Sequence, residues 1–584
     1  MLVFSSFLIL PAFSFASAVT VKVATKSGSS RLEVKLDGFS DRGSWRITGV
    51  TVTSSQKKTY SLARSGGSWV SSWQKSIANL RGTTVKLLVR RRNQTSYAKS
   101  VKLAAVPPVV PPVVDPPVEP PVDPPVVDPP VVDPPITETQ IEVDSLSPSW
   151  SPGITDFTVA CDQPVVVNAK AFEPLSIDGS APQSGSFSKT VALTPGQSFK
   201  ISGAAQQTVR CRPSDLILPT SEVNGPRQAA FYMVAPTIGN PASPYLTIFN
   251  NQGVPVWWLK ETRGVGNDFK LMSDSTVAFW HGWNSAKYDI RNLDGALAHE
   301  VSAIGYVTDL HDMQQTADGG YLTMSYVPRD CPNTAADCED LSPWGGPAVA
   351  NVTDAVIQKQ DSDGNLLWTW NSRDHIALAE SGPWIPALTS PYDIIHINSF
   401  EEDGNGIVFS ARHLDAVYRI TDPGGAGPTA GDVDWKLGGT TTAESLTSVN
   451  NPLAPNVFGG QHDARILSDG TLTVHNNGTR LSFQPRAVQY QLDTTARTAT
   501  LIDSLTDSDI PTSGCCGGAR RLPAGGWAVS WGYSSLIGEY DNQGNRVFSL
   551  RYPTGAFSYR VVPVLDNELS ATDLRQGMND QFPR

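Results

Sequence analysis

The feature that most constrains the fold is a short frame that recurs three times in the C-terminal part of the chain. Each copy has a His, an Asp-Gly pair whose Asp comes seven residues later, and then a short β-prone run. The copies are LHDMQQTADGGYLTMS (310–325), IHINSFEEDGNGIVFS (395–410) and GGQHDARILSDGTLTVHNNG (459–478). Asp-Gly between β-prone runs is a turn signal. A register shared by three copies predicts one structural position that is used three times.

A second half-repeat alternates with this frame from residue 228 to the end. It consists of a strand, an Asp or Asn, a Gly turn and a closing strand, and its six copies begin at Tyr245, Tyr288, Ala355, Ala416, Ala487 and Leu536. Repeats of about 60 residues built of hairpins are typical of propeller blades. The sequence therefore predicts a six-bladed β-propeller, closed when the segment FSYRVVPV (557–564) completes the blade begun at Tyr245. A β-sandwich array or a solenoid is the alternative.

Composition agrees with an all-β protein of several domains. The chain has 584 residues, too many for one domain, and 48 Gly and 45 Pro with only 17% charged residues. Residues 1–18 form an apolar run that ends in Ala-Ser-Ala, which predicts a cleaved signal peptide and an exported protein, whether periplasmic, cell-surface or secreted. An uncleaved anchor is the alternative, because the run lacks a basic start. No later apolar run is long enough to span a membrane.

Three segments are expected between the signal peptide and the propeller. Residues 19–104 alternate apolar and polar residues and carry 17 basic against three acidic side chains, which predicts a basic β-sandwich. This domain either contacts an anionic surface polymer or simply has a solvated basic surface, and nothing in it marks a nucleic-acid groove. Residues 105–136 are a Pro-rich linker, and residues 137–226 are a second β-sandwich that precedes the propeller at 227–584.

Six cysteines fit an oxidising compartment. We expect two disulfides, Cys161–Cys211 within the second sandwich and Cys331–Cys338 across a short polar loop. Cys515 and Cys516 are adjacent in the sequence. A disulfide between neighbouring residues is strained, so a pair of free thiols is the alternative to a bridge here.

The three histidines of the frame are candidates for one site. The innermost strands of a propeller surround its axis, so equivalent residues of different blades converge at one mouth of the channel. His311, His396 and His462 hold this register, Asn398 lies two residues after His396 on the same side of its strand, and Arg412 ends the following strand. The other histidines, which lack the register, are expected to be structural or exposed: His281, His299, His375, His413 and His475.

This residue set favours an oxyanion over a metal ion as the ligand. Three imidazoles are a common metal ligand set, but the permanently charged guanidinium of Arg412 repels a cation and matches a sulfate or phosphate. We therefore expect no metal and no cofactor. Asp312 and Asp463, which follow two of the histidines, are expected to orient those imidazoles.

The motifs DLHDMQQTADGGYL, DIIHINSFEEDGNGIVFSAR and GGQHDARILSDG resemble the blade motifs of bacterial arylsulfate sulfotransferases. The resemblance covers roughly residues 137–584 and implies a six-bladed propeller. It also implies transfer of a sulfuryl group from an aryl sulfate to a phenol by a ping-pong route, without a nucleotide sulfate donor. By position, His462 is the nucleophile that becomes sulfated, and His311, His396, Asn398 and Arg412 hold the sulfuryl oxygens. His311 or His396 also handles the phenol proton.

Two other functions remain open at the level of the sequence. A cell-surface binding propeller without catalytic activity would use the repeat histidines only to fill its channel. A metal-dependent hydrolase or lyase would use the same histidines as ligands. Loss of activity on chelation distinguishes the last reading from the sulfotransferase.

Overall fold

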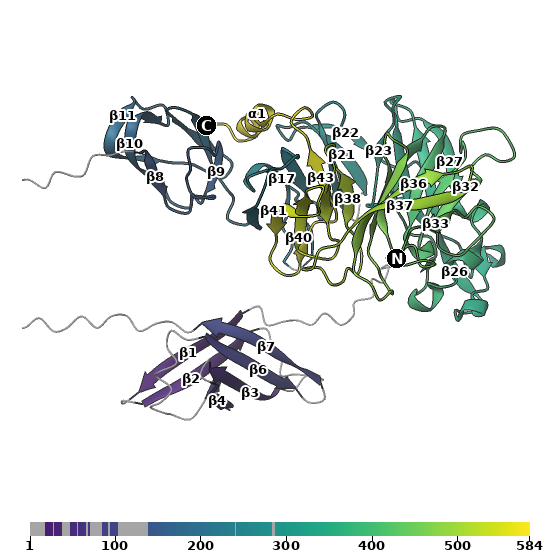
Figure 1. Cartoon of the computed structure of the whole chain (residues 1–584), viewed down its shortest axis with the longest axis horizontal. Coiled ribbons are helices and arrows are strands. Elements are labelled where there is room, and N and C mark those ends of the chain that lie inside the picture. The colour runs from purple at the N-terminus through teal and green to yellow at the C-terminus, as the bar shows by residue number, and fades with distance from the viewer. Residues whose placement is uncertain are drawn as a thin grey trace, which may run out of the picture. The chain divides into compact units, whose positions relative to one another are not determined.

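The structure is a computed structural model of the whole chain (Figure 1), and its β-strands account for nearly all of the regular structure. It describes residues 18–26, 29–37, 47–54, 57–65, 68–70, 84–91, 94–102, 138–239, 241–282 and 286–584. The predicted signal peptide and Pro-rich linker lie outside these residues. The chain divides into two compact units, residues 1–132 and 133–584. No helix among the described residues combines the length and the apolar character needed to cross a membrane.

The first unit contains seven strands in the order β1-β2-β5-β4-β3-β6-β7. Their bounds are Ala18–Lys26, Ser29–Asp37, Ile47–Ser54, Thr59–Ser65, Ser68–Val70, Thr84–Arg91 and Gln94–Lys102 for β1 to β7. Alternation places Leu32, Val34, Val50, Val52, Val85 and Leu87 in its interior. The side chains of Arg90–Arg92, part of the basic surface expected from the sequence, lie outside the described residues.

The second unit begins with a small β-domain whose strands wrap around one apolar core. Its long strand β10 pairs with β8 and β11 along its first half and with β12 along its second, with an irregular register near Ala171. The strands are β8 (Gln140–Val143), β9 (Asp156–Val159), β10 (Val165–Ile177), β11 (Gln183–Val191), β12 (Ser198–Ser202) and β13 (Gln206–Cys211). The expected disulfide Cys161–Cys211 joins the end of β13 to the residues just after its neighbour β9, with 5.7 Å between the Cα atoms.

Six sheets of four to six strands follow among the described residues. The first two are β14 (Thr220–Val223)-β41 (Arg546–Arg551)-β40 (Leu536–Tyr540)-β39 (Trp527–Ser530)-β38 (Gly518–Arg521) and β18 (Pro255–Lys260)-β17 (Tyr245–Asn250)-β15 (Phe231–Val234)-β43 (Val561–Val564). The third is β19 (Gly266–Leu271)-β20 (Val277–His281)-β21 (Lys287–Arg291)-β22 (Leu297–Val301). The fourth contains β23 (Gln314–Gln315), β24 (Tyr321–Pro328), β26 (Ala350–Gln360) and β27 (Leu366–Asn371), with the short strands β25 (Cys338–Glu339) and β28 (Tyr392–Asp393) on β26.

The last two sheets carry most of the predicted site. One is β29 (Ile397–Asp403)-β30 (Gly406–Ala411)-β31 (Ala416–Ile420)-β32 (Val433–Gly438). The other is β34 (His462–Ile466)-β35 (Thr471–Asn476)-β36 (Arg486–Asp493)-β37 (Thr498–Leu505)-β33 (Thr447–Val449). The faces of neighbouring sheets pack on shared apolar clusters, such as the one that joins Phe400, Phe409 and Tyr418 to Ile357 and Trp370.

The two ends of the propeller region close the ring. β43, at the C-terminal end, pairs with β15, and this completes the sheet of β17 as the repeats predict. β14 pairs with β41 in the same way. Two sheets, that of β17 and that of β40, therefore contain strands from both ends of the propeller region. The inner strands β29 and β34, β34 and β38, β38 and β43, and β43 and β19 lie side by side. The all-β, propeller-like architecture is confirmed, and the six sheets equal the expected repeat copies in number.

The Asp-Gly frame forms the expected hairpins between paired inner strands. In the third copy, Asp469 Oδ1 accepts bonds from the amide and hydroxyl of Thr471, and Gly470 adopts the left-handed φ of 78°. β34 and β35 pair in antiparallel fashion on either side of this turn. The turn thus fixes the end of the inner strand β34, and His462 stands at the start of the same strand.

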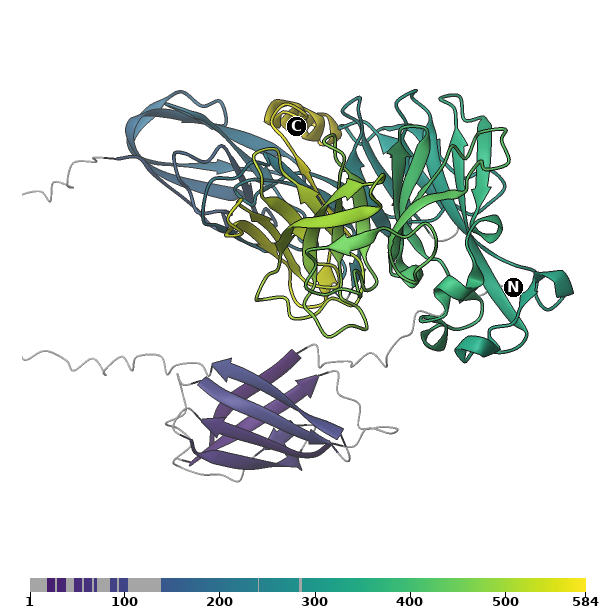
Figure 2. The same cartoon turned by 45° about the vertical axis from the view of Figure 1, so that its right-hand side comes forward.

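The α-helix α1 (Ala571–Gln581) joins the small β-domain to the propeller (Figures 1 and 2). Leu574 and Met578 are buried beside Trp257 of β18. On its other side, Arg575 forms an ion pair of 2.6 Å with Asp156, and Asn579 accepts a bond of 2.9 Å from Arg210. The helix is therefore a bracket held by apolar contacts on one face and polar contacts on the other.

Candidate active site

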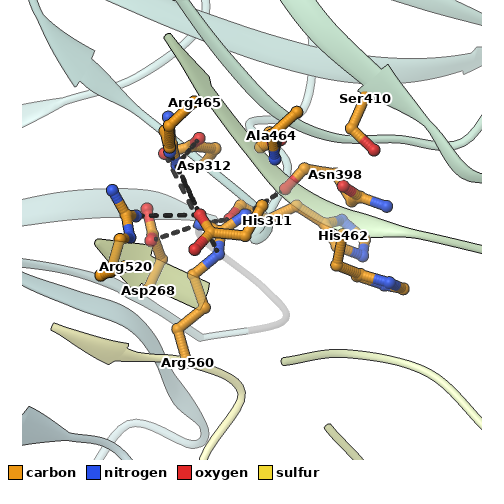
Figure 3. A network of polar contacts seen from close by, with 12 residues as sticks. Asp268, His311, Asp312, Asn398, Ser410, His462, Ala464, Arg465, Arg520 and Arg560 are labelled. Carbon is orange, nitrogen blue, oxygen red and sulfur yellow. Dashed lines mark hydrogen bonds and ion pairs between the residues drawn. The ribbon is translucent and has the colours of Figure 1, made fainter. Parts of the chain in front are cut away.

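The structure brings His311, His396 and His462 together around Tyr559. The ring centroids of His311 and His396 are 4.9 Å apart. The ring of Tyr559 lies 5.6 Å from His311 and 6.1 Å from His462, nearly perpendicular to both. Three histidines that are far apart in sequence thus face one another at the centre of the ring, where Figure 3 shows His311 and His462 next to Asn398.

The tautomer of His462 follows from its surroundings. Its Nδ1 lies 3.0 Å from the carbonyl of Gly460 and 2.8 Å from Oδ1 of Asn477. The amide nitrogen of Asn477 donates to Ser513 Oγ and to the Cys516 carbonyl, which fixes the orientation of its Oδ1. Two acceptors at Nδ1 mean that this nitrogen carries the proton. Nε2 therefore has a lone pair, and it accepts the backbone N–H of Cys516 at 3.1 Å.

Carboxylates hold the other two histidines, but not the carboxylates expected from the sequence. Nδ1 of His311 lies 2.5 Å from Asp309, and Nδ1 of His396 lies 2.5 Å from Asp393. The expectation that Asp312 and Asp463 orient the imidazoles is wrong. Both of these carboxylates pair with cations in the channel, because the chain turns their side chains away from the histidine that precedes each of them.

The equal spacing of the three histidines does not mean an equal backbone position. His396 has a left-handed φ of 56°, as have Asp463 (φ 56°) and Asp268 (φ 49°) in two other sheets, whereas His462 is not among the residues with positive φ. Asn398 and Asn267 make the same kind of contact. The side-chain amides donate to the carbonyl before the next histidine, Asn267 to Leu310 and Asn398 to Gln461.

Arg412 and His413 lie beside these histidines on the short turn after β30. Nη1 of Arg412 lies 2.6 Å from Nε2 of His413, and Nη2 donates to the carbonyl of Gly514 at 3.1 Å. The guanidinium lies over the ring of Trp384 at 4.8 Å. The ring of His413 is 4.6 Å from that of His396, so a histidine expected to lie outside the site is part of it.

A buried ionic network fills the channel next to the histidines (Figure 3). Arg560 contacts Asp268 at 2.9 Å and Asp463 at 3.3 Å, and it donates to the carbonyls of His311 and Asn398. The remaining cations of the network are Lys270, Arg465 and Arg520, which pair with Asp268, Asp312 and Asp463. Arg560 thereby ties the backbones of two candidate site residues to the last strand of the ring.

Burial lowers the pKa of three of the imidazoles. Burial, with Arg412 as the next largest cause, holds the pKa of His462 well below its usual range. Burial and the neighbouring His311 and Arg412 lower the pKa of His396 in the same way. Burial, His396 and Arg412 also lower the pKa of His413. The neutral forms of His462, His396 and His413 are therefore favoured beside the guanidinium of Arg412, a set that suits an anionic guest.

The described residues contain two sets of possible metal ligands, and one of the two lies in this site. Donor atoms of Asp393, His396 and His413 lie within 4.8 Å of one another. The guanidinium of Arg412 contacts His413 Nε2, so a cation here would meet a fixed positive charge. The donor set alone fits a metal ion, and its electrostatic surroundings do not.

The two carboxylates that hold His311 and His396 have a signal in the sequence, because each lies just before its histidine. Asp309 and Asp393 stand two and three residues before their histidines, inside the motifs DLHD and DIIH. Tyr326 and Tyr559 lie outside the frame, and Asn477 lies near the end of its third copy. Only the fold brings these three residues to the centre.

The fold and this centre define a class of protein: a β-propeller with a buried, histidine-lined polar site. Residues 269–553 match the family model described as Arylsulfotransferase (ASST). The match supports the arylsulfotransferase family for this part of the propeller, which contains all five predicted site residues. It also supports aryl sulfotransferase activity in general. No curated protein matches the sequence.

Solved propellers are similar to this chain at low identity. The WD40 β-propeller domain of Doa1 has 8% identity and a TM-score of 0.29, over 72% of this chain and 98% of that one. A streptogramin B lyase has 12% identity and a TM-score of 0.27, over 50% and 69%. Regucalcin, a calcium-binding protein of Agrobacterium tumefaciens, has 12% identity and a TM-score of 0.28, over 49% and 74%. TM-scores this low do not establish a shared fold, and the assignment of the propeller depends on the sheets described above.

Proposed function

We propose that this protein transfers a sulfuryl group from an aryl sulfate to a phenol through a covalent sulfohistidine at His462, in a ping-pong reaction without a nucleotide sulfate donor. The observation that carries the proposal is the state of His462. Two acceptors fix the proton on Nδ1, burial keeps the ring neutral, and the lone pair of Nε2 faces a site with a guanidinium. This is the arrangement that an imidazole nucleophile needs.

In the first half-reaction the lone pair of Nε2 attacks sulfur. The S–N bond forms as the bond between sulfur and the aryl oxygen breaks, and the phenolate leaves with that electron pair. The ring becomes positively charged, and the Gly460 carbonyl and Asn477 Oδ1 stabilise this charge through the Nδ1 proton. Phenols leave readily because their pKa is only about 10.

The second half-reaction is the reverse with a different phenol. Its oxygen attacks sulfur, the S–N bond breaks, and His462 regains its lone pair. A base must take the phenol proton, and the same group must return a proton to the leaving phenolate in the first half. Because the pKa of His396 lies well below its usual range, we assign this proton transfer to His311, which Asp309 holds at 2.5 Å.

Arg412, His396 and Asn398 are proposed to bind the sulfuryl oxygens. Sulfuryl transfer resembles phosphoryl transfer, in which the protein mainly positions groups and neutralises charge. Nη1 and Nη2 of Arg412 now contact His413 and Gly514 and would turn toward the anion. The Cys516 N–H, which caps Nε2 of His462, must release that nitrogen before it attacks.

The decisive test is to trap the intermediate. The wild-type protein is mixed with 4-nitrophenyl sulfate, quenched in alkali, digested and analysed by mass spectrometry. We expect one sulfuryl group on the peptide that contains His462 and a burst of nitrophenolate equal to the enzyme present. In His462→Asn both are expected to disappear. An intermediate on another residue, or an unchanged rate in the variant, would contradict the mechanism.

His299→Asn is the matched control. His299 lies on β22, and its Nε2 contacts the Tyr321 hydroxyl at 2.7 Å, away from the site. We expect its burst and turnover to equal those of the wild type. A chelator is expected to leave the activity unchanged, and loss of activity would favour a metal at Asp393, His396 and His413. If the wild type neither forms the intermediate nor turns over, a non-catalytic binding propeller becomes the better reading.

The parts outside the propeller suit an exported enzyme. We infer that residues 1–18 direct export, consistent with the disulfides Cys161–Cys211 and Cys331–Cys338. Residues 105–136 would then separate the basic domain at 19–104 from the catalytic part at 137–584. The basic domain would contact an anionic surface polymer, and its deletion is expected to release the protein from the cell surface without changing turnover.

A further inference from the structure

Tyr559 lies at the centre of the site with a hydroxyl group that no described residue engages. The side chain is 3% exposed, and its oxygen is buried without a hydrogen-bond partner among the described residues. Its ring stands between His311 and His462, with interplanar angles of 71° and 72°. Arg560 lies 5.1 Å from the ring centroid on the channel side.

An unpartnered buried hydroxyl is a cost to the folded state. Leaving such a group without a partner destabilises a protein by roughly 1–3 kcal/mol, and a phenylalanine of the same shape avoids that cost. The neighbouring Tyr326 shows the usual solution, because its hydroxyl donates to the Ile397 carbonyl at 2.5 Å. The Tyr559 hydroxyl therefore has no structural role that its contacts can explain.

The residues that act electrostatically on Tyr559 also contact the two histidines. They include Arg560, Cys516 and Asp309. Cys516 caps Nε2 of His462, and Asp309 holds His311, so these residues surround the space between the two imidazoles. Burial raises the pKa of Tyr559 well above its usual range, so the oxygen keeps its proton at any ordinary pH.

We propose that Tyr559 is a further catalytic residue, whose O–H donates a hydrogen bond to an oxygen of the sulfuryl group while this group moves to and from Nε2 of His462. The inference rests on the proposed function. The bonds that form and break remain those between sulfur, the aryl oxygen and Nε2, and Tyr559 keeps its proton throughout. A donor aimed at developing charge in a dry site is worth about 10²–10³ in rate.

The test is Tyr559→Phe, which removes one oxygen and keeps the ring. We expect kcat to fall about 10²-fold with KM little changed. The melting temperature should stay the same or rise, because the costly hydroxyl is gone. A purely structural residue would show the opposite pattern, with lower stability and unchanged turnover of the folded protein. Wild-type kcat in a stable variant would overturn the proposal.

Tyr552→Phe is the matched control. Tyr552 is also 3% exposed, and its hydroxyl also lacks a partner among the described residues, but it packs in the apolar cluster of Phe548 and Leu550. We expect the same effect on melting temperature and no effect on kcat. The contrast separates the cost of a buried hydroxyl from its use in catalysis.

Two further measurements complete the test. Binding of inorganic sulfate, followed by calorimetry, does not need turnover and is expected to weaken about tenfold in Tyr559→Phe, as for a bond to a charged group. Equal affinity would count against the donor. A sulfuryl group found on Tyr559 itself would also overturn the proposal, because the phenol would then be an acceptor. Failure of the wild type to form sulfohistidine concerns the proposed function instead.

Discussion

The backbone N–H of Cys516 donates to Nε2 of His462 at 3.1 Å, so the atom proposed to attack sulfur is covered in this structure. The same loop accepts a bond from Asn477, whose other amide atom fixes the Nδ1 proton of His462. Asn477 thus fixes the tautomer of His462 and also holds the Cys516 loop whose N–H covers Nε2. For a substrate to reach Nε2, the Cys516 N–H has to move while the tautomer is kept.

Asn477→Ala tests the control of the tautomer. Without Oδ1, the Nδ1 proton keeps only the Gly460 carbonyl, and the ring can rotate or change tautomer. We expect the rate of His462 sulfation to fall 10- to 100-fold, as for other groups that orient a reactive histidine. Single-turnover kinetics with 4-nitrophenyl sulfate measure this rate. Asn365→Ala, in an exposed turn, should leave it unchanged, and an undiminished rate in Asn477→Ala would remove the asparagine from the mechanism.

The pH profile tests the lowered pKa of His462. A histidine whose pKa lies well below 6.5 keeps its lone pair as the solution becomes more acidic. Nitrophenolate needs no proton to leave, so the first half-reaction depends on this lone pair alone. We expect its single-turnover rate to be constant from pH 8 to below pH 6. A midpoint near 6.5, the usual value for histidine, would show that the ring is not held neutral.

His475 predicts a pH-dependent loss of stability. This residue is fully buried, neither ring nitrogen has a partner among the described residues, and burial lowers its pKa to about 4. The unfolded chain binds a proton near pH 6.5, so the contribution of the neutral ring is present above that pH and is lost as pH falls toward 4. The full effect is roughly 3 kcal/mol. Denaturant unfolding of wild type and His475→Leu should differ in pH slope over this range, and equal slopes would contradict the prediction.

The channel network predicts a cost for Arg560→Met. The change takes one cation from Asp268, which keeps Lys270, and one from Asp463, which keeps Arg465 and Arg520. It also frees the carbonyls of His311 and Asn398. A buried charge left uncompensated costs about 3–5 kcal/mol, and a buried acceptor left unsatisfied roughly 1–3 kcal/mol, so we expect a loss of about 3 kcal/mol. Denaturant unfolding measures this loss, for which Arg551→Met on the surface is the control. A loss below 1 kcal/mol would mean that Lys270, Arg465 and Arg520 compensate.

The bracket formed by α1 can be tested with a double-mutant cycle on Arg575 and Asp156. The two residues make a bidentate contact that is partly exposed, so we expect a coupling of about 1 kcal/mol rather than the larger value of a buried pair. Alanine variants should also increase protease cleavage between residues 212 and 219. Independent effects of the two alanines would show that the contact does not hold the domains together.

The sequence was most informative where a residue pattern has a single structural meaning, as for turns, alternating strands and paired cysteines. The Asp-Gly turns and the alternating strands predicted the propeller, and cysteine spacing predicted both disulfides. The histidine frame predicted which residues meet but not how, because a left-handed residue at His396 shifts one copy. The misassigned carboxylates have a similar cause, since a bulge at the start of β34 decides which side Asp463 faces. Tyr559 comes from the short segment just before β43, and only ring closure places it beside His462.

The seam between β43 and β15 joins the two ends of the catalytic part, and the residues just before β43 complete its centre. During synthesis every histidine of the site therefore emerges before the strand that gathers them. A chain interrupted anywhere upstream of residue 559 would leave an open ring, with the imidazoles unassembled. Completeness of this part of the polypeptide is thus a condition for assembling the site on which the proposed function depends.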